Sequence, residues 1–482
     1  MKNLKYMLIN LPNPPGKNVY REYAGGYGTV GTLTSETILP TYLMYGASAA
    51  KRAGCLFEIL DAQGMKYESH QVVDSVERYK PDILITWISL PTLYDDLAIV
   101  QSIKKAVPDI LVISLGAMSN MLPEEVLGDS VDLAVKGRYL HYNLILNIIH
   151  KFEESKNIIE TFEHIGGAVY LEDGKVTHSS IDPPDEELDD LSFDIYNMLP
   201  VHAYIGDFFD IEGNNIRCIP LVTGTGCPFG CMYCPYPFTY GKKVNHKSID
   251  KILAEMEFLK ANFDINGFDL RDQVFTLNKE RVIKLCDEII KRKLDVKWLI
   301  ETRVDQVDHE LLSKMKDAGC FRIHYGVETG TPEMLIEVGK PGVDIKKIKD
   351  AFKMTKDLGI YTMAHVILGL PGENKETLDN TIALLYDLEP NLVNLNIATP
   401  YPGTKLFKLA SEKNWIKTYN WPEYTSYNAI MRTEDLDVDD LIKARKKIRS
   451  KFRTHQLLND SSFRKHYLKR LPQKLYYRFI KR

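Results

Sequence analysis

Short apolar runs alternate with helix-length amphipathic stretches along residues 1–150. The pattern predicts strands at 5–10, 56–61, 82–88, 110–115 and 133–135, and helices at 39–53, 94–106 and 140–152. Strands separated by helices of about 10–15 residues indicate βαβ units. The N-terminal part of the chain is therefore expected to be an α/β domain with a doubly wound parallel sheet.

Five such units suit a flavodoxin-like domain, whose ligands bind beyond the carboxyl ends of the strands. The residues expected at those ends form the runs 11–16, 61–64, 89–92, 116–120 and 136–138. They are small, polar or turn-forming, as the edge of a ligand site requires.

The next region, 151–215, is interpreted as a linker and strap. It contains a predicted hairpin with Asp173 and Gly174 at the turn, followed by the acidic run D-P-P-D-E-E-L-D-D. Beyond residue 420 the strand–helix rhythm stops, and residues 421–482 are expected to form a helical, basic segment.

Between these regions, residues 216–420 repeat strand then helix six times. The predicted strands are 219–223, 267–270, 297–301, 322–327, 361–368 and 392–398, and the predicted helices are 248–263, 279–293, 309–318, 344–358 and 375–388. Six units form a partial (β/α)6 barrel, and barrel enzymes work at the C-terminal mouth of the strands. Three cysteines, Asp272, Arg303, Glu328 and the G-L-P-G-E run at 369–373 should meet at that mouth.

Composition is that of an ordinary globular protein, with 44% hydrophobic and 26% charged residues among 482. No apolar run approaches the roughly 18 residues of a membrane-spanning helix, and the N-terminus lacks a secretory core. We therefore expect a cytoplasmic protein.

The net charge of −4 hides an asymmetry, because residues 441–482 carry 15 Lys and Arg against one acid, Asp460.

The three clustered cysteines, Cys227, Cys231 and Cys234, have the spacing C-x3-C-x2-C. Thiolates this close can converge on an iron–sulfur cluster, and three ligands leave one iron of a [4Fe-4S] cluster open. A structural zinc site normally takes four ligands from two separated pairs, and the sequence has no second pair. Seven cysteines without a signal peptide argue against a disulfide framework. Cys55, Cys218, Cys286 and Cys320 are interpreted as packing residues.

The cysteine motif, with Tyr233 before its last cysteine, resembles the signature of the radical S-adenosylmethionine (SAM) family. The resemblance implies that SAM chelates the open iron and is reductively cleaved to a 5′-deoxyadenosyl radical. Arg303 would clamp its carboxylate, Glu328 would accept from an amine or hydroxyl, and the run beginning at Gly369 would approach the adenine. Asp272 is a candidate for the amine contact. The alternatives are an Arg303–Glu328 ion pair and an Asp272 helix cap.

The runs L-I-N-L-P-N-P-P-G, R-E-Y-A-G-G-Y-G, V-I-S-L-G-A-M and W-L-I-E-T-R-V-D resemble the cobalamin-binding radical SAM enzymes. This resemblance implies cobalamin at the N-terminal sheet edge, where Ser89, Thr92, Gly116 and Gly137 are the expected contacts. The D-x-H-x-x-G motif of many cobalamin domains is absent, with Gln63 at the histidine position. Either cobalt lacks a protein ligand below it or no cobalamin binds and the domain serves packing alone.

The family implies a cobalamin-dependent radical enzyme that methylates an unactivated carbon, with SAM, a [4Fe-4S] cluster and cobalamin as cofactors. A non-methylating cyclase or oxidase of the anaerobic porphyrin-cyclase type is the alternative, and a corrinoid or redox sensor is the non-enzymatic one. A methylthiotransferase is disfavoured, because residues 1–215 contain only Cys55 for a second cluster.

The expected partners are a small-molecule or natural-product substrate and an electron donor such as flavodoxin or ferredoxin. The C-terminus combines basic and aromatic residues, and three roles are considered for it. Packing on the barrel is favoured, followed by peripheral contact with an anionic membrane and then by binding of nucleic acid.

Overall fold

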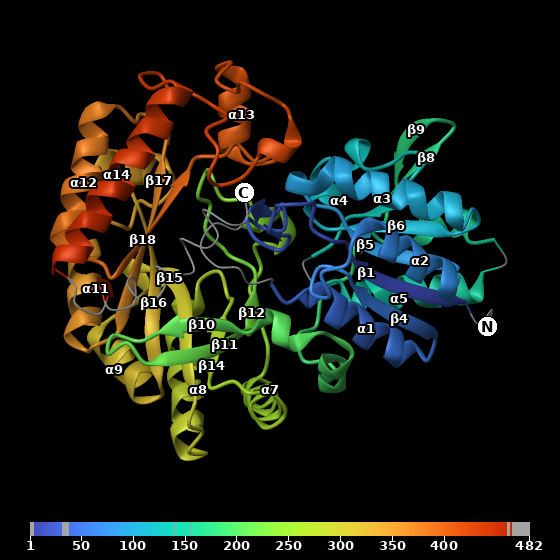
Figure 1. Cartoon of the computed structure of the whole chain (residues 1–482), viewed down its shortest axis with the longest axis horizontal. Coiled ribbons are helices and arrows are strands. Elements are labelled where there is room, and N and C mark those ends of the chain that lie inside the picture. The colour runs from blue at the N-terminus through green and yellow to red at the C-terminus, as the bar shows by residue number, and fades with distance from the viewer. Residues whose placement is uncertain (1–3, 31–37, 139, 156, 460–462, 465–482) are drawn as a thin grey trace.

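The computed structural model describes the chain except residues 1–3, 31–37, 139, 156, 460–462 and 465–482. It contains two seven-stranded sheets, each in its own half of the molecule. In Figure 1 the N-terminal sheet lies at the right in blue and cyan, and the second sheet lies at the left in green to orange.

The N-terminal sheet has the strand order β4-β1-β5-β6-β7-β8-β9. Its strands are β1 (Lys5–Asn10), β4 (Leu56–Asp61), β5 (Ile83–Trp87), β6 (Leu111–Leu115), β7 (Leu133–Val135), β8 (Ala168–Glu172) and β9 (Lys175–His178). The first five are parallel, and β8 and β9 add an antiparallel hairpin at one edge. The hairpin predicted within 151–215 is therefore present, and it extends this sheet.

Helices cover both faces of this sheet. They are α1 (Thr41–Ala53), α2 (Ser69–Tyr79), α3 (Leu93–Ala106), α4 (Ala117–Met121) and α5 (Tyr142–Glu154). Side chains alternate along a strand, so Tyr6 and Leu8 of β1 pack in the core with α1 and α5, while Met7 and Ile9 pack in the core with α2 and α3. The doubly wound parallel sheet predicted from the sequence is thus observed.

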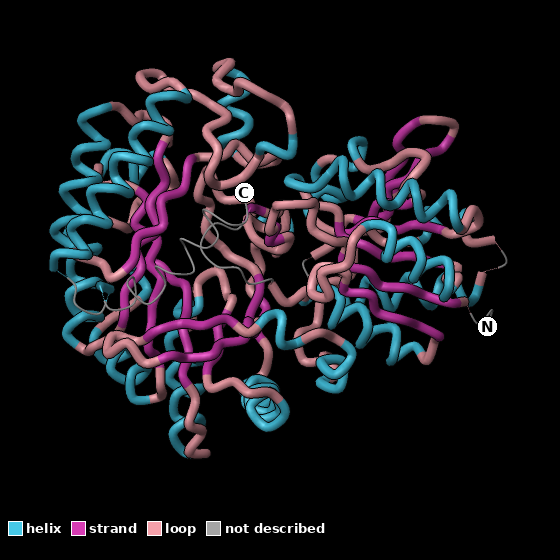
Figure 2. Tube along the Cα trace, viewed as in Figure 1, coloured by secondary structure: helices cyan, strands magenta, loops and turns pink. Residues whose placement is uncertain are grey.

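The second sheet has the order β10-β11-β14-β15-β16-β17-β18. Its strands are β10 (Gly206–Phe209), β11 (Asn215–Leu221), β14 (Gly267–Leu270), β15 (Lys297–Arg303), β16 (Cys320–Glu328), β17 (Tyr361–Leu368) and β18 (Leu392–Ile397). Six strands are parallel, as predicted, and β10 adds an antiparallel edge strand that was not predicted. Figure 2 shows these strands curved into a half-barrel with helices on its outside.

The helices of this half are α7 (Ile249–Asn262), α8 (Lys279–Lys291), α9 (His309–Asp317), α10 (Pro332–Glu337), α11 (Ile345–Asp357), α12 (Lys375–Leu388), α13 (Lys405–Glu412) and α14 (Val438–Asn459), with the short α6 (Tyr236–Thr239) after the cysteines. Side-chain caps determine where several of these helices begin. Ser248, Asn278, Asp308 and Asp344 each accept a hydrogen bond from a backbone N–H three residues later.

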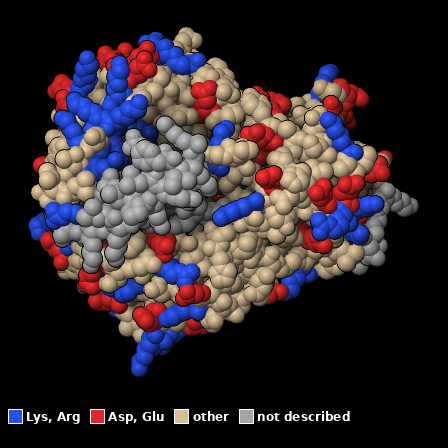
Figure 3. Space-filling view, in the orientation of Figure 1, with Lys and Arg blue, Asp and Glu red and all other residues tan. Residues whose placement is uncertain are grey.

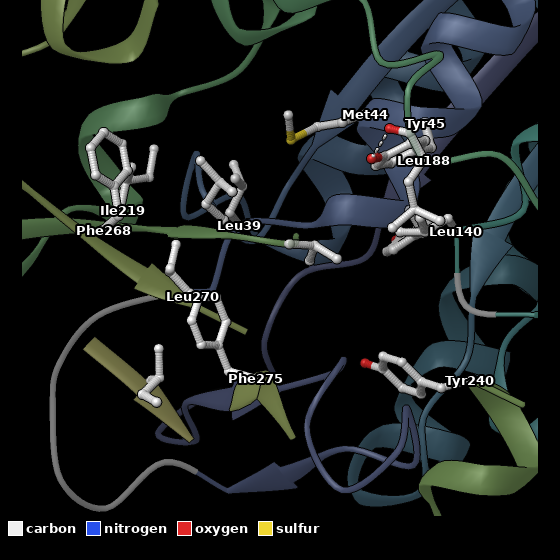
Figure 4. Packing of buried hydrophobic residues seen from close by; sticks show 14 of the residues in the cluster. Leu39, Met44, Tyr45, Leu140, Leu188, Ile219, Tyr240, Phe268, Leu270 and Phe275 are labelled. Carbon is white, nitrogen blue, oxygen red and sulfur yellow. Dashed lines mark hydrogen bonds between the residues drawn. The ribbon is translucent and has the colours of Figure 1, made fainter. Parts of the chain in front are cut away.

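One continuous core joins the two halves. Figure 4 shows Leu39 and Met44 between Tyr45 of α1 and the residues Ile219, Phe268 and Leu270 of the half-barrel, all of which belong to one cluster. The Tyr45 hydroxyl donates a hydrogen bond to the Leu188 carbonyl at 2.9 Å, which ties the connecting region to the same core.

Residues 20–28, the seam loop, join the halves on the side of the cysteines. The Tyr27 hydroxyl donates to the Pro402 carbonyl at 2.6 Å, and its ring stacks on Tyr401. The Tyr23 hydroxyl accepts from Arg271 at 2.8 Å, and the Thr239 hydroxyl donates to the Gly25 carbonyl. This loop therefore fixes the N-terminal sheet edge against the mouth of the half-barrel.

Helix α14 closes the C-terminal part that the structure describes. Leu441, Ile448 and Phe452 are buried in the core of the half-barrel. Most Lys and Arg residues of α14 are exposed. Figure 3 shows Lys and Arg side chains gathered on the surface where α14 lies. Helix α14 therefore packs on the barrel, while packing of the basic tail itself stays a prediction. The predicted basic tail beyond Arg464 lies outside the described residues.

Candidate active site

A loop after β11 carries the three cysteines, and Asp272 holds its base. The Asp272 carboxylate accepts from the Thr223 N–H at 2.9 Å, the Thr223 hydroxyl at 2.7 Å and the Gly224 N–H at 2.8 Å. Asp272 is buried, and the cap of the next helix is Asn278. The expected helix cap at Asp272 is thus wrong, because these donors occupy its carboxylate. A cofactor contact of Asp272 is not observed and stays a prediction.

The cysteines are free thiols on one loop. Burial raises the pKa of the Cys227 thiol, and the neighbouring Cys231 raises it further, whereas Arg303 and Lys340 lower it. Burial and the other two cysteines likewise raise the pKa of Cys234. Among the described residues the three sulfur atoms do not form a group within 4.8 Å, the spacing that one metal ion would need. Separated but electrostatically coupled thiols fit a cluster of several irons.

Arg303 and Glu328 both lie at the mouth, but each has another ion-pair partner. Arg303 donates to both oxygens of Asp305, at 2.9 and 2.8 Å, and its guanidinium lies 4.0 Å from the centre of the Phe229 ring. Glu328 pairs with Lys340 at 2.5 Å. The expected Arg303–Glu328 pair is therefore wrong. Arg303 Nη1 is buried without a partner, so it retains a donor for a ligand.

The backbone at Glu328 is strained. Its φ is +64°, a left-handed value that non-glycine residues avoid, and the register between β16 and β17 shifts at this point. Burial and the Glu328 carboxylate raise the pKa of Tyr233, the residue between Cys231 and Cys234, well above its usual value. Strain of this kind concentrates at functional sites, because the surrounding structure must maintain it.

Gly369 begins the predicted glycine-rich run and has a φ of +83°. Its N–H donates to a carboxyl oxygen of Glu373, and an added Cβ would lie 2.9 Å from Leu441 of α14. Glycine is thus required by the turn and by the helix behind it. Contact with an adenine stays a prediction.

At the N-terminal sheet edge, Ser89 and Thr92 belong to a buried ion-pair network. Arg21 binds Asp96 through both amino nitrogens, at 2.5 and 2.9 Å, and Arg21 also donates to Thr92 at 2.8 Å. The Ser89 and Thr92 hydroxyls lie 2.9 Å apart, and both side chains are fully buried. These hydroxyls fix the start of α3 and the seam loop, and neither is free at the surface of the edge.

The two predicted glycines face aromatic side chains at the same edge. Gly116 has a φ of +99°, and an added Cβ would lie 2.3 Å from the Trp87 ring. A Cβ at Gly137 would lie 2.7 Å from Nδ1 of His141. His141 is buried with neither ring nitrogen hydrogen-bonded, and burial lowers its pKa to about 3. Unpartnered polar atoms at the carboxyl edge of a parallel sheet are what a bound ligand would satisfy.

Gln63, at the position where many cobalamin domains have histidine, is buried and engaged. Its amide nitrogen donates to Asn13 at 2.7 Å and to the Val19 carbonyl, and its oxygen accepts from Asn10 at 3.1 Å. Its polar groups are therefore directed into the domain, and it does not offer an atom to a ligand.

A cavity of about 620 Å³ fills the lumen of the half-barrel. It extends from Tyr233 and Cys234 at the mouth to Arg322 near the start of β16. Midway, Glu301, His324 and His365 place one ligand atom each within 4.8 Å of the others, the only such group among the described residues. Arg271 lies 3.8 Å from the Glu301 oxygen and opposes an added cation there. We assign these groups as the polar wall of the cavity.

The cavity residues were missed in the sequence, although a signal exists. In the strand R-I-H-Y-G-V-E, polar or small residues alternate with the buried Ile323, Tyr325 and Val327. Successive side chains of a strand point to opposite faces, so Arg322 and His324 share the lumen face. Lys340 and Asp305 were also missed. Lys340 pairs with a residue twelve positions earlier, whereas Asp305 pairs with Arg303 only two positions earlier and could have been considered.

The profile of the radical SAM superfamily matches residues 221–385. This range begins before the first cysteine and covers Asp272, Arg303, Glu328 and the run at 369–373. Residues 221–385 therefore form a radical SAM domain.

Relatives of the chain match most of its length. An uncharacterised methyltransferase of Pyrococcus horikoshii is 26% identical over 447 residues, covering 92% of each chain. The anaerobic magnesium-protoporphyrin IX monomethyl ester cyclase of Rubrivivax gelatinosus is 29% identical over 408 residues, covering 84% of this chain and 71% of the relative. The predicted resemblance is confirmed.

Among solved structures, the fold is similar to that of the radical SAM methyltransferase TsrM from Kitasatospora setae, with cobalamin and a [4Fe-4S] cluster bound. The TM-score is 0.68 at 16% identity, covering 87% of this chain and 76% of the other. The half-barrel radical SAM fold is thus shared with a cobalamin-binding enzyme. No helix of the described residues combines the length and apolarity needed to cross a membrane.

Proposed function

We propose that this radical SAM enzyme is cobalamin-dependent and methylates an unactivated carbon of a small organic substrate. The observation that carries the proposal is the arrangement of three free thiols and a lumen cavity, joined by the seam loop to a doubly wound sheet edge. The order β4-β1-β5-β6-β7 corresponds to 2-1-3-4-5, the flavodoxin-like order. When bound, the cluster, SAM and cobalamin supply electron transfer, hydrogen abstraction and the methyl group.

The chain's own residues have assignable tasks. Cys227, Cys231 and Cys234 would hold the cluster, and the charges of Arg303 and Lys340 favour the thiolate forms of Cys227 and Cys231. Arg303 Nη1 is available to a carboxylate of SAM, while Asp272 positions the cysteine loop from behind. The lumen excludes water from the substrate because apolar and aromatic side chains line most of it.

One feature of the N-terminal sheet edge supports cobalamin binding, namely the unsatisfied nitrogens of His141. His141 offers two unsatisfied nitrogens beside Gly137 and close to Trp87 and Gly116. Since Gln63 is directed into the domain, we propose that no protein nitrogen replaces the lower ligand from that position. The domains 1–150, 151–215, 216–420 and 421–482 and an external flavodoxin or ferredoxin donor remain parts of this proposal.

A non-methylating radical cyclase is the second candidate, because the R. gelatinosus relative is named as a cyclase and matches 84% of this chain. Methyl transfer adds a carbon from SAM to the product, whereas ring closure removes hydrogens and adds none. The two reactions therefore differ in whether a labelled methyl group reaches the product.

The test uses anaerobically reconstituted protein, a chemical reductant, SAM with a deuterated methyl group, and a small-molecule extract of the source cells. We expect 5′-deoxyadenosine and a deuterium-labelled product by mass spectrometry. Cys231→Ala should lose both together with the iron–sulfur absorption, and Cys286→Ala, at a buried packing position, should retain them. An unlabelled product with fewer hydrogens would indicate cyclisation and not methylation. Absence of 5′-deoxyadenosine would overturn both proposed reactions.

A further inference from the structure

Arg322 is a buried cation that forms no ion pair within 4 Å among the described residues, and Asp269 and Asp210 act on it only from farther away. Its side chain is 6% exposed, one amino group donates to the Phe209 carbonyl at 2.6 Å, and Nε has no partner. The guanidinium lies 4.4 Å from the centre of the Tyr361 ring and 5.4 Å from that of Phe208. Arginine does not lose its proton in proteins, and an unpaired buried charge is destabilising. A fold that keeps this residue needs a compensating group.

Arg271, another arginine of the lumen, does not share this property. It lies 3.4 Å from Asp269 and 3.8 Å from Glu301, so carboxylates offset its charge. Arg449 and Arg453 of α14 also line the cavity, together with the acidic Asp207. Among the described residues Arg322, Arg449 and Arg453 form no ion pair within 4 Å, so the lining keeps cations that a bound anion could pair with.

The distance between the two ends is set by β16. Arg322 is the third residue of this strand and Glu328 is the last. Six residues of extended chain span about 20 Å. Between the ends the lining includes Met363 and Ile367 of β17 and Tyr236 after the cysteines. The cavity thus suits an elongated molecule with an apolar body.

We propose that the cavity binds a substrate with an anionic group, a carboxylate or a phosphate, that pairs with Arg322. The reacting carbon would then lie at the opposite end, beside Tyr233 and Cys234. Arginine recognises such anions through paired, charge-assisted hydrogen bonds, and the free Nε supplies a donor. This assignment of substrate class rests on the proposed function, since it takes the lumen as the substrate site.

A purely structural role for Arg322 is the competing explanation. Its bond to the Phe209 carbonyl supports the edge strand β10, and its aromatic contacts fill the base of the lumen. A structural arginine would show no preference between a charged ligand and a neutral one of the same shape. The two explanations therefore differ in ligand selectivity.

The experiment measures binding of three probes to the full-length reconstituted protein by calorimetry: 6-phenylhexanoate, 6-phenylhexyl phosphate and the neutral 6-phenylhexanamide. We expect the better anion to bind at least tenfold more tightly than the amide, and the preferred anion distinguishes carboxylate from phosphate. Arg322→Met should remove the preference. Arg292→Met, which breaks an exposed ion pair at the end of α8, should leave it intact.

Equal affinity of the wild-type protein for all three probes would overturn the proposal, whatever the folding of the variant. So would a preference that survives Arg322→Met in a protein with unchanged circular dichroism. Formation of 5′-deoxyadenosine is measured on the same samples. If 5′-deoxyadenosine forms but the anions are not preferred, only the proposed substrate class fails. If the anions are preferred but no 5′-deoxyadenosine forms, the anion site stands and the proposed function fails.

Discussion

Glu373 is a buried carboxyl group in the loop that follows β17. It is fully buried, accepts one hydrogen bond, from the Gly369 N–H, and its other oxygen has no partner. Burial raises its pKa from 4.5 to about 8. The folded protein therefore keeps this group protonated at neutral pH, while the unfolded chain ionises it.

A glutamine at this position should remove that pH dependence. Because the folded pKa is the higher one, the wild-type protein loses stability as pH rises from about 4.5 to about 8. Glu373→Gln should therefore raise the free energy of unfolding relative to wild type by roughly 5 kcal/mol above pH 8, and not below pH 4.5.

The substitution Glu376→Gln, at an exposed position three residues away, serves as the control and should show no such trend. Thermal midpoints would be compared between pH 5 and 9 under anaerobic conditions. A difference between the Glu373→Gln variant and wild type that stays constant across this range would contradict the burial argument.

At the scale of elements, the seam loop makes the closest approach between the N-terminal half and the cysteine loop. Gly25 has a φ of +64°, and an added Cβ would lie 2.9 Å from backbone atoms of Pro235 and Tyr236, directly after Cys234. Gly16 has a similar φ of +75° but nothing within 4 Å of the added atom. Alanine substitutions at the two glycines therefore distinguish the effect of backbone strain, which both share, from that of steric contact, which only Gly25 has.

Gly25→Ala should lower both the thermal midpoint and the iron content after reconstitution. Gly16→Ala should show only the cost of a left-handed alanine, roughly 1 kcal/mol, with full iron content. Iron analysis and differential scanning calorimetry of both variants test this. Identical behaviour of the two would exclude a role of the seam loop in positioning the cysteines.

The elements were predictable where periodicity was strong and local. The strands at 5–10, 56–61, 267–270 and 361–368 agree with the structure at both ends, because their apolar runs are bounded by turn or polar residues. Strand β10 escaped prediction, since a four-residue edge strand exists only by pairing with β11. Likewise Asp272, Ser89 and Thr92 were correctly placed at strand ends, but their hydrogen-bond partners come from distant segments.

At the scale of the whole molecule, charge is unevenly distributed. Residues 461–482 contain eight Lys and Arg and no acid, and they follow a helix whose exposed face is also basic. Membrane contact of this basic tail is a proposal, which rests on its mixture of basic and aromatic residues. Each basic residue near an anionic surface contributes about 1 kcal/mol.

Full-length protein should therefore sediment with vesicles containing phosphatidylglycerol at low salt and be released at high salt. Truncation after Asp460 should abolish the sedimentation, because α14 remains packed while the basic tail is removed. Vesicles of phosphatidylcholine alone provide the control. If the truncated and full-length proteins sediment equally, the basic segment has no role beyond packing.

The seam loop also has a consequence for the timing of synthesis. The Tyr27 hydroxyl bonds to a residue 375 positions later in the chain. At about 5–20 residues per second, a ribosome needs roughly 20–75 s to cover that separation. During this interval the N-terminal sheet can fold alone, while the cysteine loop emerges before the segment around Pro402 that completes the seam. We therefore expect the cysteines to be open to iron delivery on the ribosome and enclosed only when translation is nearly finished.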